Sequence, residues 1–342
     1  MNRRLRLGAT VLTLAAVAAT TLTVTRGHTA SATTADTVGV FEYDLGDDVF
    51  TDPPEWDGSS EVKAVVHYPR RATGKLPVVV LLHGQQLSCH SADEDDWTWP
   101  CPAGVRPYPS YRGYDYLADA LARDGFVVVS PSANGLNATM GVAPQRARLI
   151  DRHLALLPRL TAAGPLAGRL DLTRVGTMGH SVGGEGVFYQ AADANRAELP
   201  RGVRIRGVVS LASPGPSGFY DVTVTKLPFA VISAECWGDG DREYFDNAKG
   251  HAGTRGFFVK VAKANHNFFN TEWTTGPGPT DGDDTECPEA TGRPAATQQQ
   301  NFAVAYLKAF YAYALKGDTR TLPILTGTLP VPGVQTEIDA LP

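Results

Sequence analysis

A serine flanked by glycines stands where a strand is expected to turn into a helix. Gly179-His180-Ser181-Val182-Gly183 matches the pattern G-x-S-x-G, in which the serine sits on a sharp turn with its hydroxyl exposed as a nucleophile. Glycines are needed because side chains beside the turn would collide with neighbouring backbone. Such a match can arise by chance in a chain with 35 glycines, so the context decides. An apolar strand predicted at 175–178 and a small-residue helix at 183–192 favour a nucleophile over a surface turn.

A second element follows the continuous apolar run at 77–82, which is typical of a strand buried on both faces. His83-Gly84-Gln85 comes directly after this run. In acyl transfer, backbone N–H groups stabilise the oxyanion of the tetrahedral intermediate. We expect the N–H groups of Gln85 and Val182 to form this oxyanion hole. The alternative is a loop whose glycine serves only the turn.

A histidine lies after the last predicted strand, 257–261, in Asn265-His266-Asn267-Phe268-Phe269. In the chain order serine, acid, histidine, the general base belongs to a loop at this point. His266 is therefore the expected base. The other seven histidines fit less well by position: His28, His67, His83, His90, His153, His180 and His251.

The acid that would orient the base is less clearly marked. The strand predicted at 229–232 leads into Glu235-Cys236-Trp237-Gly238-Asp239-Gly240-Asp241. A carboxylate on this loop would hold the imidazole in its productive tautomer and stabilise the imidazolium. Asp239 is the preferred candidate, with Asp241 as the alternative and Glu235 after them. Glu185, in the first turn after the serine, is a remote alternative that also suits the helix dipole.

The first 32 residues have the layout of a secretory signal peptide. Arg3, Arg4 and Arg6 precede an apolar stretch at 7–24, and Ala30-Ser31-Ala32 offers a small-x-small cleavage site. The stretch is short and rich in threonine for a membrane span, so an uncleaved anchor is the weaker alternative. We expect cleavage after about Ala32, a mature protein without a membrane span, and a location outside the cytoplasm.

The four cysteines agree with export. Cys89 and Cys101 bracket a short insertion, and Cys236 and Cys287 both lie in the C-terminal third. Of the three possible pairings, we expect Cys89–Cys101 and Cys236–Cys287, because each staples one local region. A zinc site is the alternative, and it is weak because no pair has C-x-x-C spacing.

The chain of 342 residues is 43% hydrophobic and 20% charged, which is ordinary for a globular protein able to bury a large core. Its net charge of -5 excludes the basic footprint of a nucleic-acid binder.

Predicted strands alternate with helices, which indicates an α/β fold with a mostly parallel, doubly wound sheet in one domain at 33–342. The tail at 321–342 is rich in proline, and we expect it to lie extended on the surface. Further strands are predicted at 38–43, 61–68, 126–129 and 208–211, and helices at 111–123, 144–160 and 298–315.

Together these motifs resemble the secreted bacterial α/β-hydrolases related to chlorophyllase, platelet-activating-factor acetylhydrolase and polyester (PET) hydrolases. The resemblance covers about 78–314 and is carried by the following segments: Leu82-His83-Gly84, Ser110-Tyr111-Arg112-Gly113-Tyr114-Asp115-Tyr116-Leu117, Gly179-His180-Ser181, Gly183-Gly184-Glu185-Gly186 and Asn265-His266-Asn267-Phe268. It implies the α/β-hydrolase fold and esterase or lipase activity without a cofactor. Two departures are Val182, where an arginine is expected, and Trp237-Gly238 in the acid loop.

Aromatic residues near the expected site, notably Trp237 and Phe268, suit a cleft for an apolar acyl or aryl ester, although they suit a core equally well. The expected function is hydrolysis of small or polymeric carboxylic esters by a Ser-His-Asp triad, as in lipases and polyesterases. The alternatives are a peptidase or amidase on the same triad, or a catalytically silent binding protein. No metal is expected, since the acidic runs at 93–96 and 281–284 do not fit an EF-hand loop.

Overall fold

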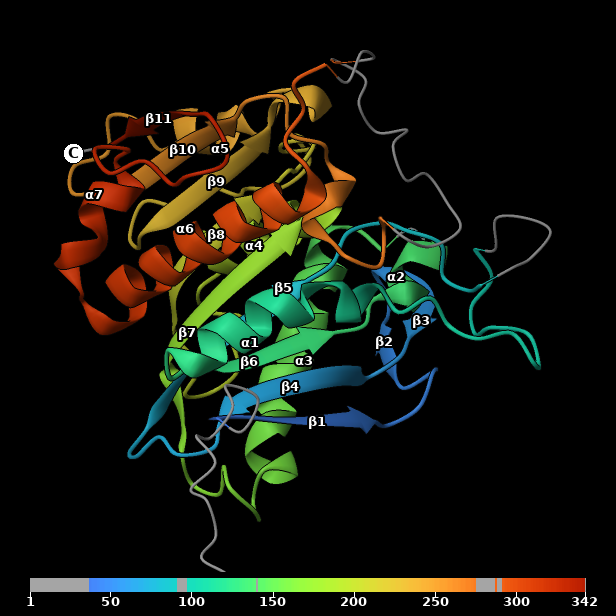
Figure 1. Cartoon of the computed structure of the whole chain (residues 1–342). Coiled ribbons are helices and arrows are strands. Elements are labelled where there is room, and N and C mark those ends of the chain that lie inside the picture. The colour runs from blue at the N-terminus through green and yellow to red at the C-terminus, as the bar shows by residue number, and fades with distance from the viewer. Residues whose placement is uncertain (1–36, 91–96, 140, 275–286, 288–290, 342) are drawn as a thin grey trace, which may run out of the picture. The chain divides into compact units, whose positions relative to one another are not determined.

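The computed structural model describes residues 37–90, 97–139, 141–274, 287 and 291–341 (Figure 1). All of them belong to one compact unit, Thr34–Pro342. The predicted signal peptide at 1–32 lies outside the described residues, as do the acidic runs at 93–96 and 281–284.

In the described part of the chain, nine strands form one mixed sheet in the order β1-β4-β6-β5-β7-β8-β9-β10-β11. The inner strands from β6 to β10 run parallel to one another, whereas β1, β4 and β11 pair in the antiparallel sense at the two sides. The strands are β1 (Val38–Asp44), β4 (Lys63–Pro69), β5 (Leu76–Leu82), β6 (Val127–Pro131), β7 (Leu170–His180), β8 (Ile205–Leu211), β9 (Phe229–Ala234), β10 (Gly256–Val261) and β11 (Thr336–Ala340). A separate hairpin pairs β2 (Phe50–Asp52) with β3 (Trp56–Ser60).

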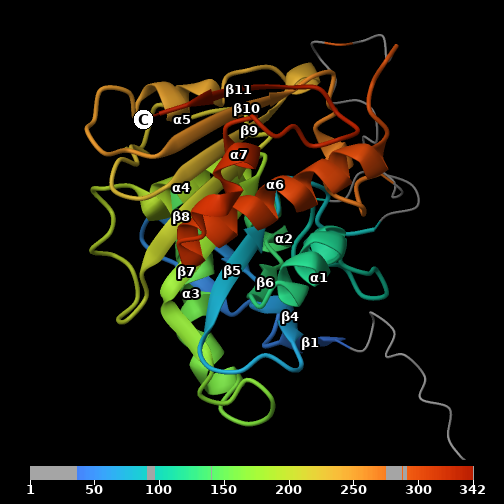
Figure 2. The same cartoon turned by 60° about the vertical axis from the view of Figure 1, so that its left-hand side comes forward.

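Helices cover both faces of the sheet (Figures 1 and 2). Side chains of successive strand residues point to opposite faces, so Val78 and Val80 of β5 join the core under α3, α4 and α5, while Val79 and Leu81 join the core under α1, α6 and α7. Burial on both faces explains why β5 is a continuous apolar run. The helices are α1 (Asp115–Arg123), α2 (Asn134–Ala138), α3 (Ala143–Leu160), α4 (Val182–Ala191), α5 (Arg242–Asp246), α6 (Ala296–Lys316) and α7 (Leu322–Leu325).

The prediction of a mixed α/β protein with a mostly parallel sheet is confirmed. The expectation of an extended surface tail is wrong in part. Residues of the tail form the short helix α7 and then β11, which pairs with β10 from Phe257↔Ala340 to Val261↔Thr336. The reason is that β10 needs a hydrogen-bonding neighbour along its outer side, and Ile338 of the tail also packs on the core there.

Both predicted disulfides are present. Cys89 and Cys101 are bridged with their Cα atoms 5.7 Å apart, and Cys236 and Cys287 with theirs 4.8 Å apart. The second bridge ties the loop after β9 to the segment that leads into α6. Among the described residues, no helix combines the length and apolar character that a membrane crossing requires.

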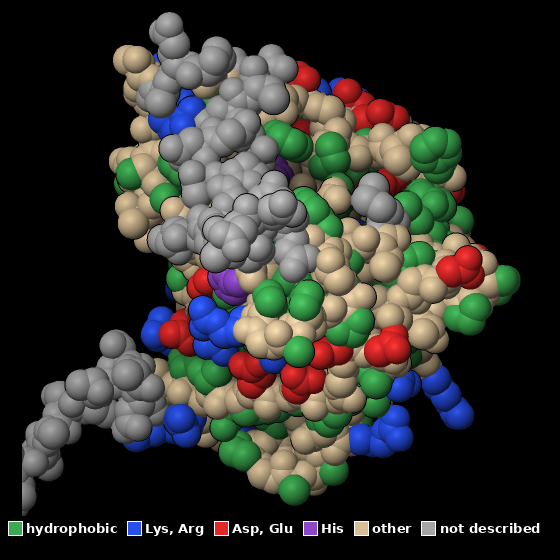
Figure 3. Space-filling model, turned by 90° about the vertical axis from the view of Figure 1, so that its right-hand side faces the viewer, with side chains coloured by type: hydrophobic (Ala, Val, Ile, Leu, Met, Phe, Trp, Pro, Cys, Tyr) green, Lys and Arg blue, Asp and Glu red, His purple; other side chains and the backbone are tan. Residues whose placement is uncertain are grey.

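The carboxyl ends of the parallel strands lie on the side of the molecule seen in Figure 3. Acidic and basic side chains lie interspersed across the lower half of this face, with apolar side chains among them. Loops at the carboxyl ends of parallel strands are where α/β sheets bind ligands. A functional site is therefore expected among these loops.

Candidate active site

Ser181 occupies a strained turn at the carboxyl end of β7. It has φ 56° and ψ -133°, and α4 begins at the next residue, Val182. A positive φ is uncommon for a residue with a side chain and is maintained only where surrounding structure enforces it. The Ser181 N–H donates to the carbonyl of Leu211 on β8 at 2.9 Å, and the Ser181 carbonyl accepts from Gly184 N–H at 2.8 Å. These bonds fix the turn and hold the serine, which is 5% exposed, at its tip.

The glycines around Ser181 permit backbone contacts that a side chain would block. A Cβ atom at Gly179 would lie 1.9 Å from the carbonyl oxygen of Gly183, and one at Gly183 would lie 3.0 Å from the carbonyl oxygen of His83. A Cβ atom at Gly84 would lie 2.4 Å from Ser181 Cβ. The loop after β5 therefore lies directly against the serine, which is the arrangement that the motif and the His83-Gly84 pair predict.

The two residues expected to form the oxyanion hole share one cavity of about 230 Å³. Val182 is the first residue of α4, and the first N–H of a helix has no acceptor within the helix and lies at its positive end. Gln85 follows Gly84 and is exposed. The remaining lining of the cavity is mainly apolar and consists of Leu136, Gly141, Val142, Ala143, Arg146, Glu185, Ser217, Phe219 and Tyr220.

His266 lies near the turn at Ser181 and is buried, with 3% of its surface exposed. Its carbonyl oxygen accepts a hydrogen bond from Nε2 of His180, the residue before Ser181, at 3.0 Å. Its Nδ1 is 2.8 Å from Oδ1 of Asn267, and its ring centroid is 4.3 Å from that of Trp237. In this structure Ser181 Oγ and the His266 ring, both described, are not hydrogen-bonded to each other.

His180 connects the turn at Ser181 to the loop of His266, a role that its position in the sequence did not predict. Because Nε2 donates to the His266 carbonyl, Nδ1 must be the acceptor, and it accepts from the Tyr114 hydroxyl at 2.9 Å. The ring stacks on Trp273 with centroids 4.6 Å apart. Burial, and then the neighbouring His266, hold the pKa of His180 well below its ordinary value. The ring therefore stays neutral and serves as a spacer; its place beside Ser181 in the motif was the available signal.

The structure separates the candidate acids clearly by their environment. Asp239 is exposed, whereas Asp241 is completely buried, with Ser233 and the backbone of Ser213 near its carboxyl group. Neither of these two carboxylates is hydrogen-bonded to His266, whose Nδ1 pairs with Asn267. Glu235 accepts from Lys263 N–H at 2.8 Å. Glu185 lies in the cavity lining and accepts from Ser217 N–H at 2.8 Å.

Asp241 makes stability depend on pH. Burial raises the pKa of its carboxyl to about 8, so between pH 4 and 8 the folded protein retains a proton that the unfolded chain releases. The free energy of unfolding must then fall as pH rises through this window. We expect Asp241→Asn to remove this dependence, which is on the order of a few kcal/mol, in urea unfolding measured at pH 5 and pH 8.5.

The matched control for this prediction is Asp239→Asn, two residues away and exposed. It should unfold with nearly the same pH dependence as the unaltered protein, because burial, rather than the charge of Asp239, is the largest cause of the raised pKa of Asp241. An Asp241→Asn protein that keeps the full difference between pH 5 and pH 8.5 would show that the dependence arises elsewhere.

The two aromatic residues expected in the substrate cleft lie on the His266 side of the site. Trp237 is half-buried against the imidazole. Phe268 is half-buried and follows His266 by two residues, with its N–H donating to Asn265 Oδ1 at 3.1 Å. The cavity next to Val182 is instead lined on its apolar side by Phe219, which is 85% exposed, and by Leu136 and Tyr220. Phe219 and Tyr220 carry no sequence signal beyond their apolar character.

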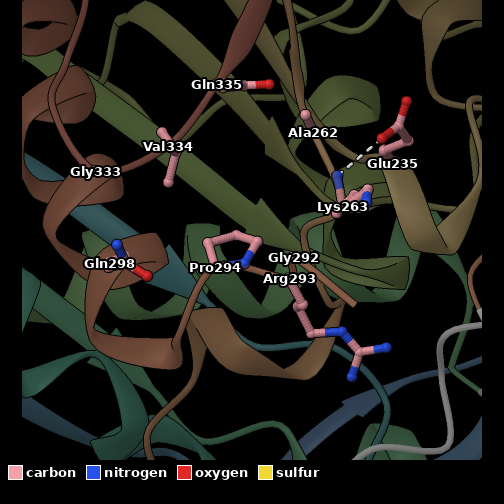
Figure 4. A pocket seen from close by; sticks show the side chains of 10 residues that line it. All are labelled: Glu235, Ala262, Lys263, Gly292, Arg293, Pro294, Gln298, Gly333, Val334 and Gln335. Atoms are coloured by element: carbon pink, nitrogen blue, oxygen red, sulfur yellow. Dashed lines mark hydrogen bonds between the residues drawn. The ribbon is translucent and has the colours of Figure 1, made fainter. Parts of the chain in front are cut away.

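A larger cavity of about 750 Å³ lies behind the acid loop, where the ends of β9 and β10 meet the approach to α6 (Figure 4). Its lining includes Glu235, Lys263 and Arg293. Lys263 N–H donates to Glu235, and its ammonium group donates to the carbonyl of Thr291 at 2.7 Å. The expected oxyanion residues Gln85 and Val182 do not line this cavity, and its charged side chains bond chiefly to the surrounding loops.

Within the described ranges, no cluster of three or more histidine, cysteine or acidic residues is arranged to hold a metal ion. A scan of the sequence against protein-family models found no matching family, and a search of curated proteins found no match.

Proposed function

We propose that this protein is a serine hydrolase of the α/β-hydrolase fold that cleaves carboxylic esters. One observation carries the proposal: Ser181, with φ 56°, sits on the turn from β7 to α4 while Gly84 of the loop after β5 lies against it. A serine nucleophile in this fold sits on such a turn, and the tetrahedral intermediate needs N–H donors beside it. The candidate donors of Gln85 and Val182 line the same cavity.

His266 acts as the general base in this proposal. Asn267 Oδ1 is an acceptor, so the Nδ1 atom that pairs with it carries the proton, and the lone pair of the neutral ring is at Nε2. That is the tautomer which takes a proton from a serine hydroxyl. Ser181 attacks the ester carbonyl, the alcohol leaves with a proton from His266, and His266 then activates water to release the acyl group.

The third member of the triad is proposed to be Asp239, with Asp241 as the alternative. Asp239 shares its loop with Trp237, whose ring lies against His266. Asp241 suits the role less well, because burial raises its pKa to about 8 and an acid that stabilises an imidazolium must be ionised. The disulfide at Cys236 anchors this loop. Together with the basic, apolar N-terminal segment, the two disulfides support an exported protein.

The apolar cavity beside Val182 favours a short acyl group or a compact aryl group. We expect p-nitrophenyl acetate and butyrate to be hydrolysed with at least a tenfold higher kcat/KM than the palmitate, because only the shorter groups fit within about 230 Å³. A fluorophosphonate probe should label the protein once, at Ser181, as located by peptide mass spectrometry.

Each outcome of this experiment has a distinct meaning. Preference for the palmitate would contradict a short acyl group in this cavity while leaving the serine hydrolase in place. Labelling at Ser181 with no ester turnover would indicate an amidase or peptidase. No labelling of folded, disulfide-bonded protein would contradict the proposed function itself.

A further inference from the structure

The peptide between Gly84 and Gln85 is held by two buried side chains. The carbonyl oxygen of Gly84 accepts from Nδ2 of Asn137 at 3.1 Å and pairs with Nδ1 of His83 at 2.8 Å. The same Asn137 nitrogen donates to the carbonyl of Gln86 at 3.2 Å. Asn137 therefore donates hydrogen bonds to the carbonyl groups of the residues before and after Gln85, although it lies on α2, far along the chain.

The direction of these bonds determines where the N–H of Gln85 points. In a trans peptide the carbonyl of one residue and the N–H of the next point to opposite sides. With the Gly84 carbonyl directed toward Asn137 and His83 in the interior, the Gln85 N–H points away from these two side chains, and Gln85 and Val182 line the same cavity. Nε2 of His83 accepts from Ala133 N–H at 2.8 Å, so Nδ1 carries the proton and donates it to the Gly84 carbonyl. Burial lowers the pKa of His83 to about 3, which keeps the ring neutral.

A buried arginine sets the orientation of Asn137. Nη2 of Arg146 donates to Asn137 Oδ1 at 2.8 Å, so the oxygen faces the arginine and the amide nitrogen faces the loop. Nε of Arg146 donates to the carbonyl of Gly141 at 3.1 Å. Arg146 is 3% exposed and lines the same cavity. A flipped amide would set its NH₂ group against the guanidinium, where no acceptor is present.

We propose that Asn137 is a positioning residue for the oxyanion hole, and that Arg146 holds it in the orientation this requires. The inference rests on the proposed esterase function, which it deepens. Asn137 touches no reacting atom; it keeps the Gly84–Gln85 peptide turned so that one N–H is directed at the developing oxyanion. Its loss should therefore affect the transition state more than substrate binding.

The test compares Asn137→Ala with Asn134→Ala. Asn134 is a matched control because it lies on the same short helix, is equally buried, and also donates through its amide to two carbonyls, those of Ser88 at 3.0 Å and Tyr108 at 2.8 Å. We expect Asn137→Ala to lower kcat for p-nitrophenyl butyrate about 100-fold with KM within about twofold, as for removal of an oxyanion donor. Asn134→Ala should lower the unfolding midpoint similarly and keep kcat within threefold of the unaltered protein.

A second variant, Asn137→Asp, keeps the side-chain volume and the bond from Arg146 but has no N–H to donate. We expect it to lose kcat as Asn137→Ala does, which removes a packing defect as the explanation. If the unaltered protein is active and both Asn137 variants match Asn134→Ala in kcat, the positioning role is overturned and the esterase stands. If the unaltered protein neither reacts with fluorophosphonate nor hydrolyses an ester, both proposals are overturned together.

Discussion

Replacing Ser181 with alanine is expected to abolish ester hydrolysis while leaving the protein folded. Loss of the nucleophile in a serine hydrolase lowers kcat by about 10⁶-fold, leaving only what binding and the oxyanion hole supply. The turn should persist, because its hydrogen bonds to Leu211 and Gly184 use the main chain of Ser181. The measurement is turnover of p-nitrophenyl butyrate with the near-ultraviolet circular dichroism spectrum recorded on the same sample.

Ser210→Ala provides the matched control. Ser210 lies on β8 beside α4, is completely buried, and its hydroxyl has no partner within the described residues. Removing such a hydroxyl is close to neutral for stability, so kcat should stay within about twofold. Turnover of the Ser181→Ala protein above one thousandth of the starting rate would assign the nucleophile to another residue.

Gly179→Ala is expected to destroy the nucleophile turn and to destabilise the protein by about 3 kcal/mol or more. The added Cβ would lie 1.9 Å from the carbonyl oxygen of Gly183. That carbonyl cannot easily withdraw, because Gly183 itself lies against the backbone of Leu82 and His83 at the end of β5. The strand and the helix would have to move apart, which displaces Ser181 from the N–H donors. Urea unfolding and the rate of fluorophosphonate labelling measure the two consequences.

The control for this prediction is Gly164→Ala. Gly164 has a positive φ of 83° but no atom within 4 Å of an added Cβ, so only backbone strain of about 1 kcal/mol is expected. Labelling should proceed at the unaltered rate in this protein. A Gly179→Ala protein that unfolds and reacts like Gly164→Ala would show that the turn tolerates a side chain, contrary to the contact geometry.

Several features of this protein follow from local sequence because each depends on neighbours in the chain. The inner strands are apolar runs, since both of their faces are covered by helices. The turn at Ser181 is marked by glycines that only a tight strand–helix junction requires. The disulfides join the cysteines that share a region of the chain. These signals suffice for the fold class, the two disulfides and the tight turn at Ser181.

Other features depend on residues that are distant in sequence, and only the folded chain brings them together. Asn137 donates a hydrogen bond to the carbonyl of Gly84, 53 residues away in the chain. Nothing in the short sequence of α2 predicts this bond. Asp239 and Asp241 are two residues apart and alike in type, yet one is exposed and the other buried with its pKa raised to about 8. The tail pairs with β10 because the backbone groups along the outer side of that strand are available for hydrogen bonds in the folded sheet. Local pattern specifies which face a residue presents, whereas burial, pKa and hydrogen-bond partners are set by whatever the fold places against that face.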